Sequence, residues 1–282
     1  MTRAAASWRR LPRPGRAGLV VVLLILAIAV AGPWFAPYPP DASIGPPFAP
    51  ASAEYPLGTD GIGQDVLSRV LSGGRSVLLL AGLATLLAYA VGVPLGLLAG
   101  YSRGVAGAII MRGVDVLLAV PALLLLLVLA TGAGAGAVVL VIGIAIVHVP
   151  QITRIVRAAT LQTTGRAFIE AAEARGDSTA RILGVEVLPN ISGALLADVG
   201  VRFTGSVLLV AALNFLGLGL QPPASDWALM ISENRSGISI QPWAVVAPAA
   251  LLAALAVSVN LFADGIAQVY ARASARRVEA SA

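Results

Sequence analysis

The sequence predicts an all-α fold, that of a polytopic membrane protein with six transmembrane helices and both termini cytoplasmic. Three observations support this prediction. Of the 282 residues, 58% are hydrophobic and only 12% are charged, with a mean hydropathy of +0.88, whereas soluble domains carry about 25% charged residues. Six apolar stretches have about the length needed to cross a bilayer. The arginines are distributed unevenly between the segments that join these stretches.

The six apolar stretches follow one another along the whole chain. Five of them reach the roughly 20 residues that a helix needs to cross the hydrocarbon core. The fourth is less clearly bounded, because three glycines blur its start and Pro150 lies within it. The predicted spans are residues 17–36, 77–99, 108–131, 137–155, 199–220 and 243–263.

The first stretch has an alternative interpretation as a cleaved signal peptide. It follows a basic N-terminus, residues 29–31 resemble a cleavage site, and the arginine pair at 9–10 resembles a twin-arginine signal. The apolar run is long for a signal peptide, however, and Trp34 and Phe35 extend it with an aromatic interfacial anchor. A retained first span is the favoured interpretation.

The arginines predict the orientation of the spans. With a cytoplasmic N-terminus, sixteen arginines fall in cytoplasmic segments, and Arg69, Arg75 and Arg235 fall outside. Such a bias is typical of cytoplasmic loops. Placing both termini inside requires an even number of spans, so the charge distribution agrees with a count of six.

Missing residue types exclude several kinds of chemistry. The chain has no cysteine, so disulfides, thiolate metal sites and cysteine nucleophiles are excluded. All nineteen basic residues are arginine, and a phosphate-binding P-loop needs lysine. A single histidine cannot form a metal site alone. The arginines are scattered between apolar runs, which fits membrane topology better than nucleic-acid binding.

The longest polar stretch lies between the fourth and fifth spans and is predicted to be cytoplasmic. Residues 168–175 are mostly good helix formers, and Gly176 is a natural helix terminator. Asp177 and Ser178 can cap a second helix that Pro189 would end. The pattern predicts a helix, a tight turn and a second helix. Its residues alone leave open whether this is an ordinary solvated loop or a surface for another protein.

Two outside segments are also informative. Residues 38–55 are rich in proline and alanine and predict an irregular loop. Thr59 or Asp60 would then cap a short helix lying in the outer interface, with polar Asp65, Ser68 and Arg69 on its outer face. Between the fifth and sixth spans, residues 221–241 form a loop that is either a docking surface or an interfacial anchor built on Trp227 and Trp243.

Polar residues within the spans are interpreted as structural. Asp115 is expected to pair with Arg112, and Asp198 with Arg202. His148 is expected to bond a neighbouring helix rather than line a path. Hydrogen bonds between helices are expected from Asn214 and Asn260, and close helix packing from Gly82, Gly92, Gly96, Gly143, Gly200 and Gly205.

Motifs spread over nearly the whole chain resemble the permease subunits of binding-protein-dependent ABC importers. The predicted cytoplasmic loop resembles their EAA loop through Glu170, Ala171, Ala172, Gly176, Leu188 and Pro189, with Asp177 and Ser178 beside the glycine. The segment before the second span resembles the signature of the dipeptide/oligopeptide/nickel subfamily through Gly58, Thr59, Asp60, Asp65 and Arg69. Residues 92–101, 111–119 and 214–223 resemble further segments of this subfamily, closest to its C-type permease.

The resemblance implies a fold, a role and partners. The chain would have the ABC importer permease fold and form half of a translocation path for peptides in the cytoplasmic (inner) membrane. Its partners would be a B-type permease, two cytoplasmic ABC ATPases, an extracytoplasmic solute-binding protein and membrane lipid. The chain would be no enzyme and would hold no cofactor or metal, because ATP and Mg would be bound by the ATPases. The helix at Glu170 would sit in an ATPase cleft, and the binding protein would dock near Pro222, Pro223, Asp226 and Trp227.

The predicted domain organisation has three parts. Residues 1–74 contain the N-terminal tail, the first anchor, the outside loop and the interfacial helix. Residues 75–271 form the core permease domain, which includes the cytoplasmic coupling loop at 159–195. Residues 272–282 form a cytoplasmic tail.

Three positions depart from the family pattern, and the cargo stays open. Gln64 stands where arginine is usual, Asp177 where alanine is usual, and Glu186 where isoleucine or histidine is usual. They would tune which ATPase fits. The same architecture imports nickel chelates, glutathione or other small solutes. An ion-coupled secondary transporter should show repeats or buried carboxylates, and a membrane enzyme should show clustered catalytic side chains. Both fit the sequence less well.

Overall fold

The structure is a computed structural model that describes residues 11–102, 104–134, 136–222 and 224–281. The predicted all-α fold is confirmed there, since the described residues contain helices and two isolated β-bridges but no strand. The helices are α2 (Arg13–Ala31), η1 (Gly32–Phe35), α3 (Val66–Ser72), α4 (Gly74–Tyr101), α5 (Val105–Ala119), α6 (Ala122–Ala133), α7 (Ala137–Thr164), α8 (Ala167–Ala174), α9 (Thr179–Arg181), η2 (Ile182–Val187), α10 (Leu188–Phe215), α11 (Trp227–Asn234), η3 (Arg235–Gly237) and α12 (Trp243–Ser281).

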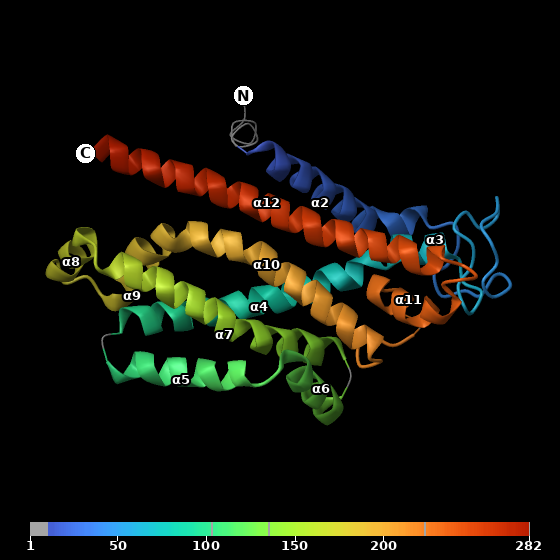
Figure 1. The fold of residues 1–282 in the computed structure, drawn as a ribbon, viewed down its shortest axis with the longest axis horizontal. Coiled ribbons are helices and arrows are strands. Elements are labelled where there is room, and N and C mark those ends of the chain that lie inside the picture. Colours follow the sequence, from blue (N-terminus) through green and yellow to red (C-terminus); the bar gives the residue numbers. More distant parts are fainter. Residues whose placement is uncertain (1–10, 103, 135, 223, 282) are drawn as a thin grey trace.

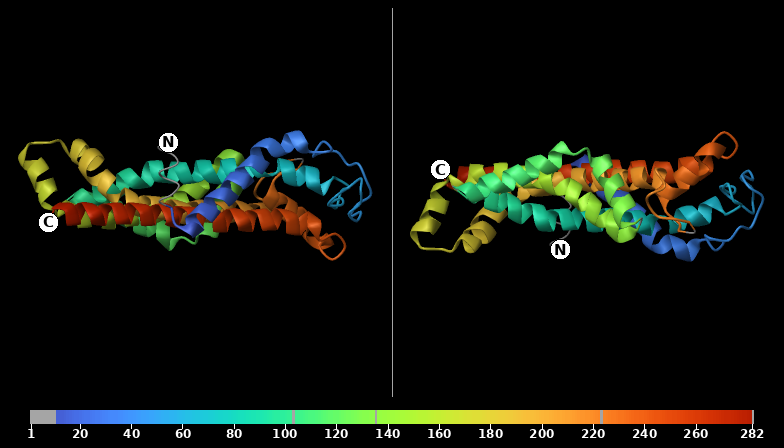
Figure 2. Two further views of the ribbon diagram at one scale, coloured as in Figure 1. Left: turned by 90° about the horizontal axis from the view of Figure 1, so that it is seen from above. Right: turned by 90° about the horizontal axis from the view of Figure 1, so that it is seen from below.

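The long helices run side by side along the long axis of an elongated bundle (Figure 1). One end carries α8, α9 and the end of α12, and we call it the α8 end. The opposite end carries α3, α11 and the loop that precedes α3, and we call it the α3 end. Both views of Figure 2 keep these groups at opposite ends. Five helical segments in the described residues are long and apolar enough to span a membrane, or six if α5 and α6 form one broken span.

The third predicted span is not one straight helix, which corrects the expectation for residues 108–131. Helices α5 and α6 meet at an angle of 85°. The break falls at Val120, which has an extended backbone, and at Pro121, which precedes α6. Proline lacks a backbone N–H and disfavours helical backbone in the residue before it. The apolar sequence is therefore continuous through residues 108–131, but the helix is broken within it.

Pro189 does not end a helix as predicted. It lies in the first turn of α10, directly after the π-helix η2. One helical segment runs from Thr179 to Phe215 by way of the π-helix η2. Helix α10 therefore begins eleven residues before the predicted start at 199. At the other end of the chain, α12 continues from the predicted core into the predicted tail as far as Ser281.

Small residues allow a close contact between α4 and α7. A Cβ added to Gly92 would lie 2.9 Å from Cβ of Ile152, and one added to Gly96 would lie 2.5 Å from Cβ of Val156. Both distances are shorter than real Cβ contacts, so these glycines are required for the packing, as predicted. Gly82 differs, because an added Cβ there would meet no described atom within 4 Å.

The predicted polar pairs are partly confirmed. Asn260 of α12 donates to Thr204 of α10 at 2.7 Å, which is an interhelical bond as expected. Asp115 pairs with Arg154 of α7 at 2.6 Å rather than with Arg112. The prediction of an i,i+3 pair on α5 was therefore wrong, because the tertiary fold brings a different arginine to this carboxylate.

Candidate functional site

Helix α8 is the central element of the predicted EAA loop, and its two faces differ. Ile169 and Ala172 face inward and are buried against Ile182 and Val187 of η2. The opposite face is exposed and presents Glu170, Ala171 and Ala174. The inner face thus anchors α8 on the bundle, and the outer face has shallow alanine side chains that leave room for a close approach.

The turn after α8 has the hydrogen bonds of a Schellman motif. The N–H of Asp177 donates to the carbonyl of Ala172 at 3.1 Å, and the N–H of Gly176 donates to the carbonyl of Glu173 at 3.0 Å. Gly176 has φ of +77°, which glycine adopts without the steric penalty of a side chain. The predicted sharp turn at Gly176 is confirmed. All these groups lie in the loop at residues 165–187, which we call the α8 loop.

The segment after the turn joins α8 to a transmembrane helix. Ser178 caps α9 by accepting from the N–H of Arg181 at 3.4 Å, as the sequence predicted. Helix α9 passes into η2 and then α10, where Leu188 is partly buried and Pro189 is exposed. Because the backbone stays helical from Thr179 to Phe215, a displacement of α9 would be passed directly to α10.

Two of the three departures from the family pattern lie in one charge cluster. Asp177 pairs with Arg175 at 2.9 Å and with Arg181 at 3.3 Å. Glu186 lies 3.9 Å from the same Arg175. The arginines are more than half exposed, so these pairs contribute little to stability. Their effect is to fix the charge pattern of the turn.

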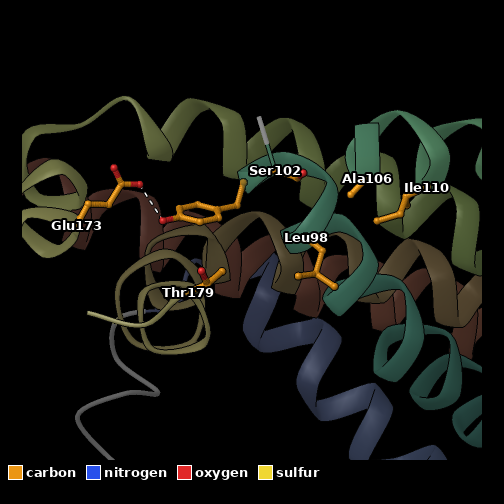
Figure 3. A pocket seen from close by; sticks show the side chains of 7 residues that line it. Leu98, Ser102, Ala106, Ile110, Glu173 and Thr179 are labelled. Carbon is orange, nitrogen blue, oxygen red and sulfur yellow. Dashed lines mark hydrogen bonds between the residues drawn. The ribbon is translucent and has the colours of Figure 1, made fainter. Parts of the chain in front are cut away.

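A pocket of about 550 Å³ lies behind the α8 loop, between the end of α4, the start of α5 and helices α8 and α9 (Figure 3). Tyr101 donates its hydroxyl to Glu173 across it at 2.8 Å. Leu98 and Ile110 form part of its apolar wall. Sequence reasoning missed this pocket because its walls come from segments about 70 residues apart, and no local pattern marks that meeting.

At the α3 end, Arg69 is the centre of a buried ion-pair network. Its side chain is 2% exposed and contacts Asp60 at 2.6 Å and Glu233 at 2.8 Å. Asn234 also accepts from the N–H of Gly61 at 2.9 Å. We call these five residues the α3 clasp. It ties the loop before α3 to α11, across more than 160 residues of sequence.

The clasp corrects two expectations about α3. Its N-cap is Asp65, which accepts from the N–H of Ser68 at 2.8 Å, rather than Thr59 or Asp60. The polar face of Asp65, Ser68 and Arg69 is buried, so the prediction that α3 exposes this face was wrong. The signature residues serve the fold, since the hydroxyl of Thr59 accepts from the N–H of Ala49 at 2.8 Å.

Gly58 completes the packing of this loop. It has φ of +75°, and a side chain there would collide with Gln241. Gln241 in turn donates to the carbonyl of Ala49 at 2.7 Å. The five predicted signature residues Gly58, Thr59, Asp60, Asp65 and Arg69 are therefore all buried at the α3 end.

Two residues of the predicted docking loop do not reach the surface. Trp227 is 0% exposed and donates its indole N–H to the carbonyl of Val70 at 2.7 Å. Asp226 is buried and caps α11 through the N–H groups of Ala228 and Leu229. Neither can touch a docked protein in this structure, and Trp227 is no interfacial anchor. Pro222 is exposed, and Pro223 lies outside the described residues.

The carboxylate of Asp226 is held by four donors. Besides the two backbone groups, Ser76 donates at 2.6 Å and Asn214 at 2.9 Å. Burial raises the pKa of Asp226, and the hydrogen bonds oppose that rise. Asn214 thus bonds a residue at the start of α11, which ties α10 to this loop.

Comparison with known proteins identifies similar chains. A family model described as "binding-protein-dependent transport system inner membrane component" matches residues 92–273. A second, described as the N-terminal TM domain of oligopeptide transport permease C, matches residues 6–56. The di/tripeptide transport system permease protein DppC of Pseudomonas aeruginosa is 38% identical, covering 88% of this chain and 84% of that protein.

Two further relatives and one solved structure complete the comparison. The dipeptide transport system permease protein DppC of Haemophilus influenzae is 32% identical, covering 88% of this chain and 87% of that protein. The glutathione transport system permease protein GsiD of Pectobacterium atrosepticum is 36% identical, covering 92% of this chain and 87% of that protein. The inward-facing MetNI methionine ABC transporter matches with a TM-score of 0.59 and 18% identity, over 72% of this chain and 95% of that chain, which shows a shared fold.

Proposed function

Because this chain belongs to the family of binding-protein-dependent transport system inner membrane components, we propose that it is the permease subunit of an ATP-driven peptide importer. It forms half of a translocation path in the inner membrane. The names of its relatives support a dipeptide or oligopeptide cargo. The five or six candidate spans found in the described residues support a multi-pass membrane protein.

The α8 loop is the proposed docking site for a cytoplasmic ATPase, and its geometry is the observation that carries the proposal. An exposed alanine face on a helix anchored by Ile169 and Ala172 suits insertion into a cleft of a partner. Arg166, Arg175 and Arg181 lie around this loop, which favours a cytoplasmic location for the α8 end.

The remaining partners follow from this role. A second, B-type permease supplies the other half of the path, and two ABC ATPases bind ATP and Mg. This chain has no lysine for a phosphate-binding loop, so the chemistry belongs to those subunits. A solute-binding protein docks at the α3 end. In the docking loop of this chain, the buried side chains of Asp226 and Trp227 hold the loop in place, and exposed residues such as Pro222 make the contact.

The mechanism is a transfer of motion from the α8 loop to the two long helices that it joins. The α8 loop connects α7 to α10, and both are candidate membrane spans. ATP binding closes the ATPase dimer and displaces α8, which moves α7 and α10 relative to each other and switches access to the path. This is rigid-body gating rather than chemistry by the permease.

The test is a charge placed on the exposed face of α8. Ala171→Arg should reduce co-purification of the ATPase subunits at least about tenfold, as expected for disrupting the centre of an interface. Ala53→Arg, exposed at the opposite end, is the control and should leave co-purification unchanged. Equal recovery of ATPase with both variants, at equal thermal stability, would show that α8 is not the docking site.

Glutathione is a second candidate cargo. The match to the glutathione permease GsiD covers 92% of this chain, against 88% for each of the two DppC proteins above. Native mass spectrometry of the partner binding protein would distinguish the two, since it retains the ligand it delivers. A bound dipeptide or oligopeptide supports our first proposal, and bound glutathione replaces it.

A further inference from the structure

Polar side chains of α10 join it to α4 and α7 in the middle of the bundle. The predicted pair of Asp198 and Arg202 is confirmed, with Nε 3.0 Å from Oδ1. Tyr89 of α4 donates its hydroxyl to the other oxygen of Asp198 at 2.7 Å. Arg202 also donates to the side-chain oxygen of Gln151 of α7. We call these four residues the polar seam.

The polar seam is enclosed by apolar packing on both sides. Asp198 is 8% exposed and Arg202 is 16% exposed. Toward the α8 end, Ile191 of α10 packs in one apolar cluster. Toward the α3 end, Val210 of α10 packs in another. Charged groups inside a membrane protein are energetically expensive, and their presence points to a function.

Two pairs of these helices are also joined by close contacts at glycine. Helices α4 and α7 are joined through Gly96 and Val156, and α10 and α12 through Gly200 and Ala263, where an added Cβ would lie 2.6 Å from Cβ of Ala263. Because such close contacts leave little room for sliding, we treat each pair as one body. The polar seam lies between these two bodies. The α8 loop connects them, because it joins α7 to α10.

His148 provides an alternative partner within the same layer. It lies one turn before Gln151 on α7 and is buried, with its ring against Gly205 of α10. Neither ring nitrogen has a hydrogen-bond partner among the described residues, so the expected bond to a neighbouring helix is not formed. A buried imidazole with unused hydrogen-bonding capacity can receive Asp198 or Arg202 when α10 shifts along α7.

We propose that the polar seam is a latch that holds the α10–α12 body against the α4–α7 body in the state seen here. Its release accompanies the switch in access to the path, so this inference rests on the proposed transport function. A seam of a few hydrogen bonds suits this role, because one interhelical bond changes an equilibrium in a membrane only about threefold on average. The apolar layers on either side exclude intermediate arrangements, which makes the two states discrete.

The absence of cysteine allows a direct test of the latch. Val138→Cys on α7 and Leu208→Cys on α10 are exposed sites for spin labels. The full transporter, with its partner permease and ATPases, is reconstituted in nanodiscs, and pulsed EPR gives the distance distribution without nucleotide. Tyr89→Phe should enlarge a second distance population about threefold. Asp198→Asn, which leaves Arg202 without its counterion, should enlarge it at least about tenfold.

The control removes an interhelical bond inside one body. Asn260→Ala breaks the bond between α12 and α10 and should leave the distribution unchanged. The latch is refuted if Tyr89→Phe leaves the distribution of the parent, or if the Asn260 variant shifts it equally. Should Asp198→Asn fail to assemble, Tyr89→Phe decides. A last outcome separates the two proposals. If adding ATP changes the distance distribution of no protein, while the seam variants still differ from the parent without nucleotide, the transport proposal fails and the latch stands.

Discussion

The turn at Gly176 gives the sharpest prediction for the α8 loop. Gly176→Val places a β-branched residue at φ of +77°, and the left-handed region costs an L-residue about 1–2 kcal/mol. An added Cβ would meet no described atom within 4 Å, so the penalty comes from the backbone rather than from a collision. A penalty of this size lowers the population of the native turn about five- to thirtyfold. Loss of the turn also breaks its two Schellman hydrogen bonds.

The assay is ATP-driven peptide uptake in proteoliposomes that contain the partner subunits, with ATPase stimulation measured in parallel. Gly176→Val should lose uptake in proportion to the lost turn, while Gly176→Asn should keep most of it, since asparagine tolerates this conformation. Gly184→Val is the matched control, because Gly184 lies in the same loop with open space around it and without a positive φ. Normal coupling in Gly176→Val, or an equal loss in Gly184→Val, would refute the reasoning.

Three further predictions concern the rest of the fold. Arg69→Met leaves the buried carboxylate of Asp60 without its ion-pair partner, so it should destabilise the protein by about 3–5 kcal/mol and lower the thermal midpoint in detergent. An unchanged midpoint would contradict a stabilising role of the α3 clasp. Gly96→Leu should cost at least about 1–3 kcal/mol by overpacking α4 against α7, whereas Gly82→Leu, with open space around it, should be neutral in the same melt. Burial raises the pKa of Asp226, so the stabilisation from its protonated form is full below an unfolded pKa of about 3.9 and is lost as pH rises through the folded pKa. Asp226→Asn removes this titration, so the thermal midpoint of the variant should fall less between pH 4 and 8 than that of the parent. An equal fall in both proteins would contradict this prediction.

Features that depend on neighbours along the chain were predictable. The apolar stretches located the long helices, because crossing a bilayer demands length and low polarity from each segment by itself. The turn at Gly176 and the cap at Ser178 were also found, since both follow from backbone rules within a few residues. The break before Pro121 follows from a local rule of the same kind, but the prediction missed it because hydropathy alone shows a continuous apolar run.

The sequence by itself therefore determined an all-helical membrane protein and the helix–turn–helix of the α8 loop. Only the tertiary structure decided which polar residues are buried and with which partners. Arg69 and Trp227 look like surface residues in the sequence, yet contacts more than 150 residues away enclose them. Asp115 likewise forms an ion pair with Arg154 of another helix rather than with Arg112 of its own helix. Burial is a property of the assembled helices, and it depends on contacts between segments that no local pattern specifies.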